Sequence, residues 1–317
     1  MTVRFIRSLD DFSLKADRGT ITTVGTFDGI HLGHQAIFRR VREESLRTGC
    51  ESVLVTFHPH PKVVVSPDNI PMLLTTIEEK EKFVPDYFDG QVLVLEFNEQ
   101  LMNMTAEDFV REILIDRIDT RKLIVGYDHA FGRGRSGNID QLRKLGDNYG
   151  FEMEVVAPVI IDNEPVSSTR IRKAMIKNRY PEAIRLLGHE YAVSGRVERG
   201  ISLGKKIGFP TANVSCSGRK LLPPEGVYAC WIQIDNEEKN GMMFIGRNHF
   251  NPKARLTIEV NLFDFDRDIY DREIIVFPTT YVRENMKFAS TDELVKQLNI
   301  DKNNIIEILN KGVKDVN

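Results

Sequence analysis

The sequence predicts a chain of two parts, an α/β part built on a parallel sheet and an antiparallel β-barrel followed by a C-terminal helix. Up to residue 188, short apolar runs alternate with amphipathic helical segments, the pattern of a parallel sheet with helices on both faces. From Tyr191 onward, apolar residues recur at every second position between turn signals, which is typical of antiparallel strands. A length of 317 residues is enough for two separate cores. We therefore expect domains at residues 1–188 and 189–317.

The bulk composition excludes several classes of protein. With 41% hydrophobic residues, 28% charged residues and a net charge of −3, the chain has no global electrostatic basis for binding nucleic acid. No apolar run approaches the roughly 18 residues of a membrane helix, and the N-terminus lacks the apolar region of a signal peptide. Cys50, Cys216 and Cys230 form no CxxC motif, which indicates reduced thiols. We expect a cytoplasmic protein that acts on small molecules, and the sequence does not predict its oligomeric state.

Five buried strands are expected in the first domain, with helices between them. Capping signals place the start of one helix at Thr76 or Ile77, of another at Thr105 and of a third after Asn138. The helix that follows the first strand is expected to end at Gly49. The expected strands are residues 21–24, 52–57, 91–97, 122–125 and 154–157. The apolar residues of the first helix that are expected to face inward are Ile37, Phe38, Val41 and Leu46.

The connection between the first strand and the first helix reads GTFDGIHLGH, over residues 25–34. A helix N-terminus offers unpaired N–H groups and a positive dipole end, so a glycine-containing turn at this place suits a phosphate. His31 and His34 are three residues apart and can both donate to one triphosphate. The pattern is neither GxGxxG nor GxxxxGK[ST], so it indicates neither a dinucleotide-binding site nor a P-loop. The alternative is an ordinary strand–helix turn with surface histidines.

Two further loops are expected at the same edge of the sheet, because the carboxyl ends of parallel strands meet there. His58-Pro-His60-Pro follows the second strand, and residues 126–132, GYDHAFG, follow the fourth. Either loop alone could be a tight turn. Zinc is a rival use of the four histidines, but catalytic zinc draws three protein ligands with supporting carboxylates, whereas these histidines are interleaved with phosphate-type glycines.

A cluster of hydroxyl and guanidinium groups follows the last strand, in VSSTRIR at residues 166–172. Arginines at a helix start face the positive dipole end, so the cluster indicates an anion rather than a salt-bridged helix. We expect this helix to span residues 168–177, with a shorter one from Pro181 to Gly188.

The 25–34 block resembles the HxGH signature of adenylyltransferases, and in its longer form the bifunctional riboflavin kinase/FAD synthetase family. The resemblance implies a Rossmann-like nucleotidyltransferase domain that transfers AMP from ATP to FMN with Mg²⁺. It implies catalytic roles for His31, His34 and Arg170. The nucleotide-binding residues that it implies in this domain are Gly25, Thr26, Phe27, Asp28, Gly33, Ser168, Thr169 and Arg172. The flavin-binding residues that it implies are His58, Pro59, Tyr127, Asp128 and Phe131.

The second domain reads as a barrel of about six antiparallel strands. Asp235-Asn236 and Asn240-Gly241 are predicted turns, and Ser290-Thr-Asp-Glu293 is a capping box that opens a final helix. The clearest period-two runs are residues 191–197, 227–234, 256–262 and 274–276.

Glycines and lysines gather before one barrel strand, in residues 195–213, and form a loop suited to a polyphosphate. Thr211 and Asn213 are two apart on a strand, so both can offer oxygen to Mg²⁺ from one face. By composition alone this stretch is a solvated hairpin loop. The string GFPTAN at residues 208–213, however, resembles a motif of the riboflavin kinase family. The ATP-binding residues that the resemblance implies here are Gly200, Gly204, Lys205, Gly208 and Pro210, with Thr211 and Asn213 on the metal.

Glu259 lies between apolar neighbours, so its carboxylate is expected to be partly buried and is a candidate general base for the riboflavin 5′-hydroxyl. An outward-facing strand position is the alternative, and the resemblance implies the catalytic role. Residues 244–252 depart from the family pattern, with Phe244 in place of a polar residue and no following proline motif. Alternatives therefore stay open: an adenylyltransferase with a weak or inert barrel or a different acceptor, or a non-catalytic flavin- or nucleotide-binding regulator.

Overall fold

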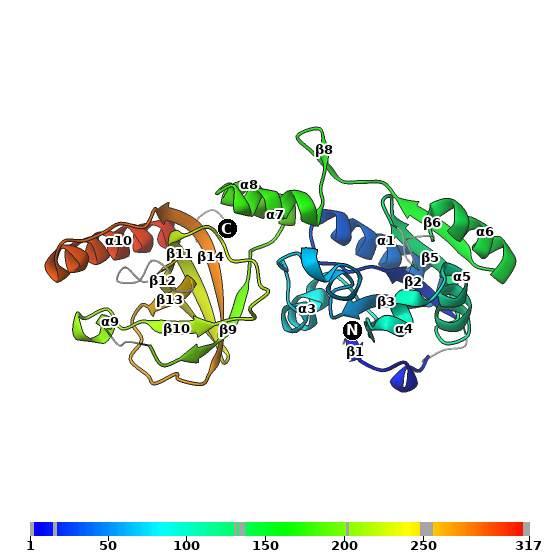
Figure 1. The fold of residues 1–317 in the computed structure, drawn as a ribbon, viewed down its shortest axis with the longest axis horizontal. Coiled ribbons are helices and arrows are strands. Elements are labelled where there is room, and N and C mark those ends of the chain that lie inside the picture. Colours follow the sequence, from blue (N-terminus) through cyan, green and yellow to red (C-terminus); the bar gives the residue numbers. More distant parts are fainter. Residues whose placement is uncertain are drawn as a thin grey trace. The chain divides into compact units, whose positions relative to one another are not determined.

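The computed structural model describes residues 3–14, 18–129, 132, 137–200, 203–247 and 256–312. Its contacts divide the chain into two compact units, Met1–Ser168 and Thr169–Asn317, which are described one at a time (Figure 1). The predicted parallel sheet lies in the first unit and the predicted barrel in the second.

A six-stranded parallel sheet forms the first unit, in the order β1-β4-β3-β2-β5-β6. All five expected strands are present, and a short edge strand, β1, joins them. Because β2 has β3 on one side and β5 on the other, the chain reverses its direction of winding at β2, which is the point where open α/β sheets bind ligands. The strands are β1 (Arg4–Ile6), β2 (Thr20–Val24), β3 (Glu51–His58), β4 (Gln91–Glu96), β5 (Thr120–Gly126) and β6 (Glu152–Val156).

Helices cover both faces of this sheet, as the alternating pattern predicted. One core cluster joins α1 and α3 to the sheet through Phe38, Val41 and Ile77. The other joins α6 and the π-helix that follows α5 to the sheet, through Leu142 and Phe109. The α-helices are α1 (Leu32–Thr48), α2 (Lys62–Val65), α3 (Ile77–Phe83), α4 (Glu99–Asn103), α5 (Ala106–Asp108), which continues as a π-helix (Phe109–Ile115), and α6 (Ile139–Tyr149). Short 3-10 helices lie at Leu9–Asp11, Pro67–Asn69 and Val84–Asp86. A small hairpin, β7 (Ile160–Ile161) and β8 (Glu164–Pro165), follows β6.

The predicted helix ends are confirmed by local hydrogen bonds. Thr76 and Glu79 form a complete capping box at α3, and Asn138 accepts from the third residue of α6. Gly49 ends α1 in the left-handed conformation at φ 74°. One expectation about α1 is wrong: Leu46 is 74% exposed, because it lies five residues after Val41 and therefore points away from the buried face of the helix.

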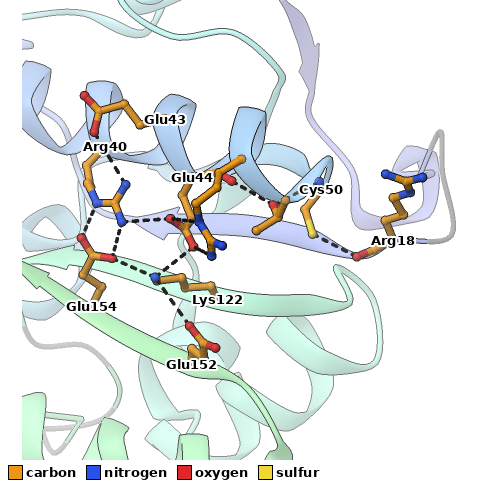
Figure 2. A network of polar contacts seen from close by, with 10 residues as sticks. Arg18, Arg40, Glu43, Glu44, Cys50, Lys122, Glu152 and Glu154 are labelled. Atoms are coloured by element: carbon orange, nitrogen blue, oxygen red, sulfur yellow. Dashed lines mark hydrogen bonds and ion pairs between the residues drawn. The ribbon is translucent and has the colours of Figure 1, made fainter.

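A charged cluster fixes α1 to strands β5 and β6 (Figure 2). The carboxylate of Glu44, only 1% exposed, accepts hydrogen bonds from Arg47 at 2.6 Å, Arg40 at 2.9 Å and Lys122 at 3.1 Å. Arg40 and Lys122 also pair with Glu154 on β6. These cations, Arg47 first, hold the pKa of Glu44 at about 2. A periodicity argument that seeks apolar residues does not find a buried carboxylate, so this contact was not predicted from the sequence.

The second unit is a closed barrel of six antiparallel strands in the order β10-β13-β12-β11-β14-β9. Two helices precede it, and a short helix, α9, stands where the sequence predicted only a loop. The elements are α7 (Ser168–Ile176), α8 (Tyr180–Leu187), β9 (Val193–Glu198), α9 (Leu203–Lys206), β10 (Ala212–Ser215), β11 (Gly226–Ile234), β12 (Glu237–Arg247), β13 (Leu256–Leu262), β14 (Glu273–Arg283) and α10 (Thr291–Gly312).

One predicted turn in the barrel is confirmed and one is wrong. The turn from β11 to β12 is at Asp235-Asn236, with Asp235 at φ 53°. Asn240-Gly241 lies inside β12 instead. A Cβ atom at Gly241 would come within 2.6 Å of the carbonyl oxygen of Asn261 on β13, so the glycine permits close strand approach rather than a turn.

Helix α10 packs on the outside of the barrel. Its Ile305 joins Val227, Ala229, Met242 and Phe263 in an apolar cluster on that face. The predicted cap is present, since Ser290 accepts from the N–H of Glu293, whose carboxylate accepts from the N–H of Ala289. The helix is further tied to β14 by a bidentate pair between Arg283 and Asp301.

Among the described helices, none combines the length and the low charge that crossing a bilayer would require. The three cysteines are free thiols, with Cys230 buried in the barrel and the other two half-buried.

The Glu44 cluster leads to a stability prediction. Glu44→Gln removes the carboxylate that three cations share, although Arg40 and Lys122 keep their pairs with Glu154. We therefore expect the free energy of unfolding to fall by about 2 kcal/mol, a value between those for exposed and for buried ion pairs. Because the folded pKa of about 2 lies below the ordinary 4.5, the contribution is complete above pH 4.5 and disappears as the pH falls towards 2. Urea unfolding followed by circular dichroism measures both effects. Glu43→Gln is the control, because Glu43 is 57% exposed and pairs with Arg40 at 3.6 Å. Equal losses from the two variants would contradict the prediction.

Candidate active sites

The turn between β2 and α1 has an unusual backbone. Phe27 and Ile30 adopt positive φ angles of 45° and 44°, and Gly29 lies between them at φ 93°. Non-glycine residues rarely take this conformation, so the surrounding structure must hold it in place. The ring of Phe27 lies over Gly25, where a Cβ atom would be 2.9 Å from the ring. The strand thus ends in a tight turn that brings the backbone to the N-terminus of α1.

Segment 74–76 holds this turn from one side. The carboxylate of Asp28, 1% exposed, accepts from the N–H groups of Leu74 at 3.2 Å and Thr75 at 2.8 Å. In return the hydroxyl of Thr75 accepts from the N–H of Gly29 at 2.9 Å. The structure therefore gives Asp28 a supporting contact that the sequence did not predict. Its predicted contact with the nucleotide stays a prediction.

The two histidines lie against each other at the first turn of α1. Their rings stack with centroids 3.6 Å apart, and the edge of His34 meets the ring of Phe27 at 5.3 Å. Burial lowers the pKa of His34 well below its usual value, and the neighbouring His31 and Lys80 lower it further. The Nδ1 atom of His34 is buried and hydrogen-bonds to no atom of the described residues. A polar atom held in this state is suited to a ligand.

The two predicted flavin loops lie at the carboxyl ends of the strands on either side of β2. His58 ends β3 and is joined to Pro59 by a cis peptide bond, while Tyr127 and Asp128 follow β5. Since the three strands are parallel neighbours, these loops and the β2–α1 turn share one edge of the sheet. His58, Tyr127 and Asp128 are exposed there. Phe131 lies outside the described residues.

The hydroxyl and guanidinium cluster lies at the start of α7. Ser168 donates from its hydroxyl to the carbonyl oxygen of Asp28 at 2.8 Å, which ties the end of the first unit to the β2–α1 turn. In the second unit, Arg170 faces Glu182 of α8 at 3.8 Å, Thr169 is exposed and Arg172 is half-buried.

Three oxygen-bearing side chains predicted in the barrel come together. The hydroxyl of Thr211 is 3.4 Å from a carboxylate oxygen of Glu259, and Asn213 lies directly opposite Glu259 in the β10–β13 pairing. Glu259 is half-buried, as predicted. A hydroxyl, an amide and a carboxylate are the hard oxygen donors that Mg²⁺ prefers, so the residues present suit that ion.

Glycines bring the preceding loop onto this trio. A Cβ atom at Gly200 would be 2.1 Å from the amide nitrogen of Asn213, and one at Gly204 would be 3.3 Å from the hydroxyl of Thr211. The two glycines are therefore needed for close approach and not for flexibility alone. Lys205, Gly208 and Pro210 are exposed on the same stretch.

The departure from the family pattern lies beside the trio. Glu259 of β13 has a cross-strand partner on each side. Asn213 of β10 is its partner on one side, and Phe244 of β12 is its partner on the other. The ring of Phe244 lies over Gly246, where a Cβ atom would be 2.5 Å away. Residues 248–252 of the departing stretch lie outside the described residues.

A cavity of about 720 Å³ in the second unit was missed from the sequence. It lies on the outer face of the barrel beside α10. The period-two pattern of the barrel strands could have indicated this face, because Phe263 is four residues after Glu259 and therefore lies on the same side of the barrel wall. The lining of the cavity includes Trp231, Asn240, Phe263, Thr279, Ile308 and Leu309.

Across the part of the chain that the structure describes, no three side chains of His, Cys, Asp or Glu gather in the manner of a metal-binding cluster.

Both parts of the chain match models of known families. Residues 13–170 match the FAD synthetase model and residues 187–309 match the riboflavin kinase model. The fold and the two sites thus define a two-domain transferase that builds flavin nucleotides. At 34% identity over 98% of its length to one relative, the chain belongs to the bifunctional riboflavin kinase/FMN adenylyltransferase family.

Relatives resemble the chain from end to end. The 34% identical relative, from Buchnera aphidicola, is matched over 98% of both chains, and one from Pseudomonas fluorescens is 37% identical over 90% of this chain and 91% of its own. Both are named bifunctional riboflavin kinase/FMN adenylyltransferase. A solved structure from Streptococcus pneumoniae, titled a macrolide-efflux protein, is 30% identical with a TM-score of 0.82, covering 96% of this chain and 98% of its own.

The histidine pair leads to an activity prediction. His34→Ala removes a preorganised polar group at the helix N-terminus, so we expect the rate of FAD formation from FMN and ATP to fall on the order of a hundredfold or more. Product chromatography with the purified variant measures the rate. Arg39→Ala, at an exposed position of the same helix, should retain the wild-type rate. An unchanged rate in His34→Ala would remove this residue from the site.

Proposed function

We propose that the barrel phosphorylates riboflavin to FMN with ATP and that the α/β unit adenylylates FMN to FAD, releasing pyrophosphate. The observation that carries this proposal is the presence of two separate sets of polar side chains on one chain, each at the position that its chemistry requires. One is the stacked histidine pair at the N-terminus of α1, and the other is the group of Thr211, Asn213 and Glu259.

In the adenylylation, a phosphate oxygen of FMN forms a bond to the α-phosphorus of ATP, and the bond from that phosphorus to pyrophosphate breaks. The protein need supply no covalent group, only alignment and stabilisation of the charge that grows on pyrophosphate. We assign the alignment and charge stabilisation to His31 and His34. The residues that we assign to the nucleotide around them are Gly25, Thr26, Phe27, Asp28 and Gly33.

The start of α7 is assigned to the ATP phosphates. Arg170 and Arg172 carry forked donors that match phosphate oxygens, and Ser168 and Thr169 add hydroxyl donors. The resemblance of this segment to the family's second adenylyltransferase motif supports the assignment. The flavin of FMN is assigned to the loops after β3 and β5, through His58, Pro59, Tyr127, Asp128 and Phe131.

In the phosphorylation, the 5′-hydroxyl oxygen of riboflavin forms a bond to the γ-phosphorus, the bond to ADP breaks, and Glu259 takes the hydroxyl proton. Thr211 and Asn213 would hold Mg²⁺, which neutralises phosphate charge when bound. ATP is assigned to the preceding stretch, through Gly200, Gly204, Lys205, Gly208 and Pro210.

We place the ring system of riboflavin in the cavity beside α10. Glu259 and Phe263 lie on one face, and a strand rises about 3.3 Å per residue, so the four-residue step from one to the other spans roughly 13 Å. A ribityl chain and part of a tricyclic ring cover that distance. The apolar walls given by Phe263, Ile308 and Leu309 suit a flat aromatic ring.

We further propose that the two activities divide near residue 188. The match to the riboflavin kinase model, which begins at residue 187, supports this boundary, although the contacts group α7 and α8 with the barrel. We also propose that the protein acts in the cytoplasm, where free thiols such as its own are stable.

A variant of the barrel tests the division of labour. Glu259→Gln removes the proposed base, so we expect FMN production from riboflavin to be lost, while FAD production from supplied FMN continues. Chromatography of products formed from riboflavin and from FMN, each with Mg-ATP, measures both steps. Glu273→Gln, at an exposed position of β14, should leave both steps unchanged.

The same assay distinguishes the alternatives in the wild-type protein. FAD from both substrates supports the proposal. FAD from FMN but not from riboflavin would mean that the kinase is inactive because of Phe244 and its neighbours. No product from either substrate, or loss of both steps in Glu259→Gln, would overturn the proposal.

A further inference from the structure

The side chain of Lys80 is buried although it carries an ammonium group. It lies in the first turns of α3, is 7% exposed, and donates a hydrogen bond to the carbonyl oxygen of Thr26 in the β2–α1 turn. No carboxylate forms an ion pair with it among the residues that the structure describes. A buried charge without a paired counter-ion lowers stability, and proteins keep such groups where function requires them.

No carboxylate contacts the Lys80 ammonium directly among the described residues. Asp28 acts on it from a distance and favours its charged form, while that carboxylate accepts hydrogen bonds from the N–H groups of Leu74 and Thr75. On α3 itself, Glu79 is bonded to the N–H of Thr76 in the capping box. His34, stacked on His31, is close enough to be disfavoured in its cationic form by the ammonium.

Positive charge therefore lies next to the β2–α1 turn, which leads into the N-terminus of α1. Lys80 contacts a carbonyl oxygen of this turn, and the positive end of the α1 dipole lies at its other side. A polyanion at the turn would be attracted by both the Lys80 ammonium and the helix N-terminus.

We propose that Lys80 is a positioning residue of the adenylylation step, which holds the Thr26 carbonyl and supplies positive charge behind the phosphates of ATP. The assignment rests on the proposed function of the first unit. Lys80 does not touch the reacting atoms, and it acts through the turn and through its charge. None of the sequence motifs contains it.

The charge on Lys80 gives the assignment a pH signature. Burial lowers the pKa of Lys80 to about 8, against the opposing charge of Asp28. The ammonium is thus present below pH 8 and lost above it in the free protein. Since kcat/KM reports the free enzyme, kcat/KM for ATP should fall as the pH rises through 8.

The experiment compares wild type with Lys80→Met, Lys80→Gln and the control Lys82→Met, which changes an exposed lysine of the same helix. FAD formation from FMN is measured between pH 6 and 10. At pH 7 we expect both Lys80 variants to lose about tenfold or more in kcat/KM for ATP, the scale of supporting residues. The fall around pH 8 should be absent from them and present in wild type and in Lys82→Met.

A second measurement separates charge from folding. Hydrogen–deuterium exchange of β2 and α1 should be unchanged in the Lys80 variants, and phosphorylation of riboflavin by the same molecules should continue at the wild-type rate. Faster exchange at β2 and α1 together with lost activity would make Lys80 a folding residue and overturn the proposal.

Two kinetic outcomes would also overturn it. One is a Lys80→Met variant with wild-type kcat/KM, and the other is a variant that keeps the fall around pH 8 at the same midpoint. If the wild-type protein makes FAD from FMN, either outcome concerns Lys80 alone. If the wild-type protein makes none, the proposed function fails and the inference fails with it.

Discussion

The β2–α1 turn is the constraint on which the first unit depends. Phe27 and Ile30 hold positive φ angles that cost about 1–3 kcal/mol each for ordinary residues. The cost is offset because both side chains are buried in the core under α1, and because Asp28 and Thr75 exchange hydrogen bonds across the turn. The position of the histidine pair follows from this backbone. A chain that relaxed the turn would still form the sheet, but it would lose the arrangement that presents polar atoms to an anion.

The barrel site depends on a different constraint, the register of its strands. Asn213, Glu259 and Phe244 share one cross-strand row because β10, β13 and β12 pair at these residues. A shift of one residue would turn Glu259 into the barrel interior and separate it from Thr211. The close packing at Gly241 helps to prevent such a shift, since no larger residue fits between Ile232 and the backbone of Asn261.

Much of this organisation could be predicted because local patterns determine it. Alternating strands and helices gave the parallel sheet, and caps at Thr76, Asn138 and Gly49 gave helix ends within a residue. What could not be predicted depends on contacts between distant residues. Asp28 and Thr75 are 47 residues apart in the sequence, and no periodic pattern indicates that they form a hydrogen bond. For the same reason, Asn240-Gly241 was expected to be a turn, although the packing of β12 against β13 decides its conformation.

Trp231 is the single tryptophan of the chain, and it lies in the barrel. Its indole stacks on Phe277 with centroids 3.8 Å apart, donates to Glu190 and lines the cavity beside α10. The tryptophan fluorescence of the whole molecule therefore comes from one indole at one cavity wall. A flavin that entered the cavity would absorb that emission, whereas the first unit contributes no indole of its own. The chain thus carries a built-in optical probe for occupancy of its barrel.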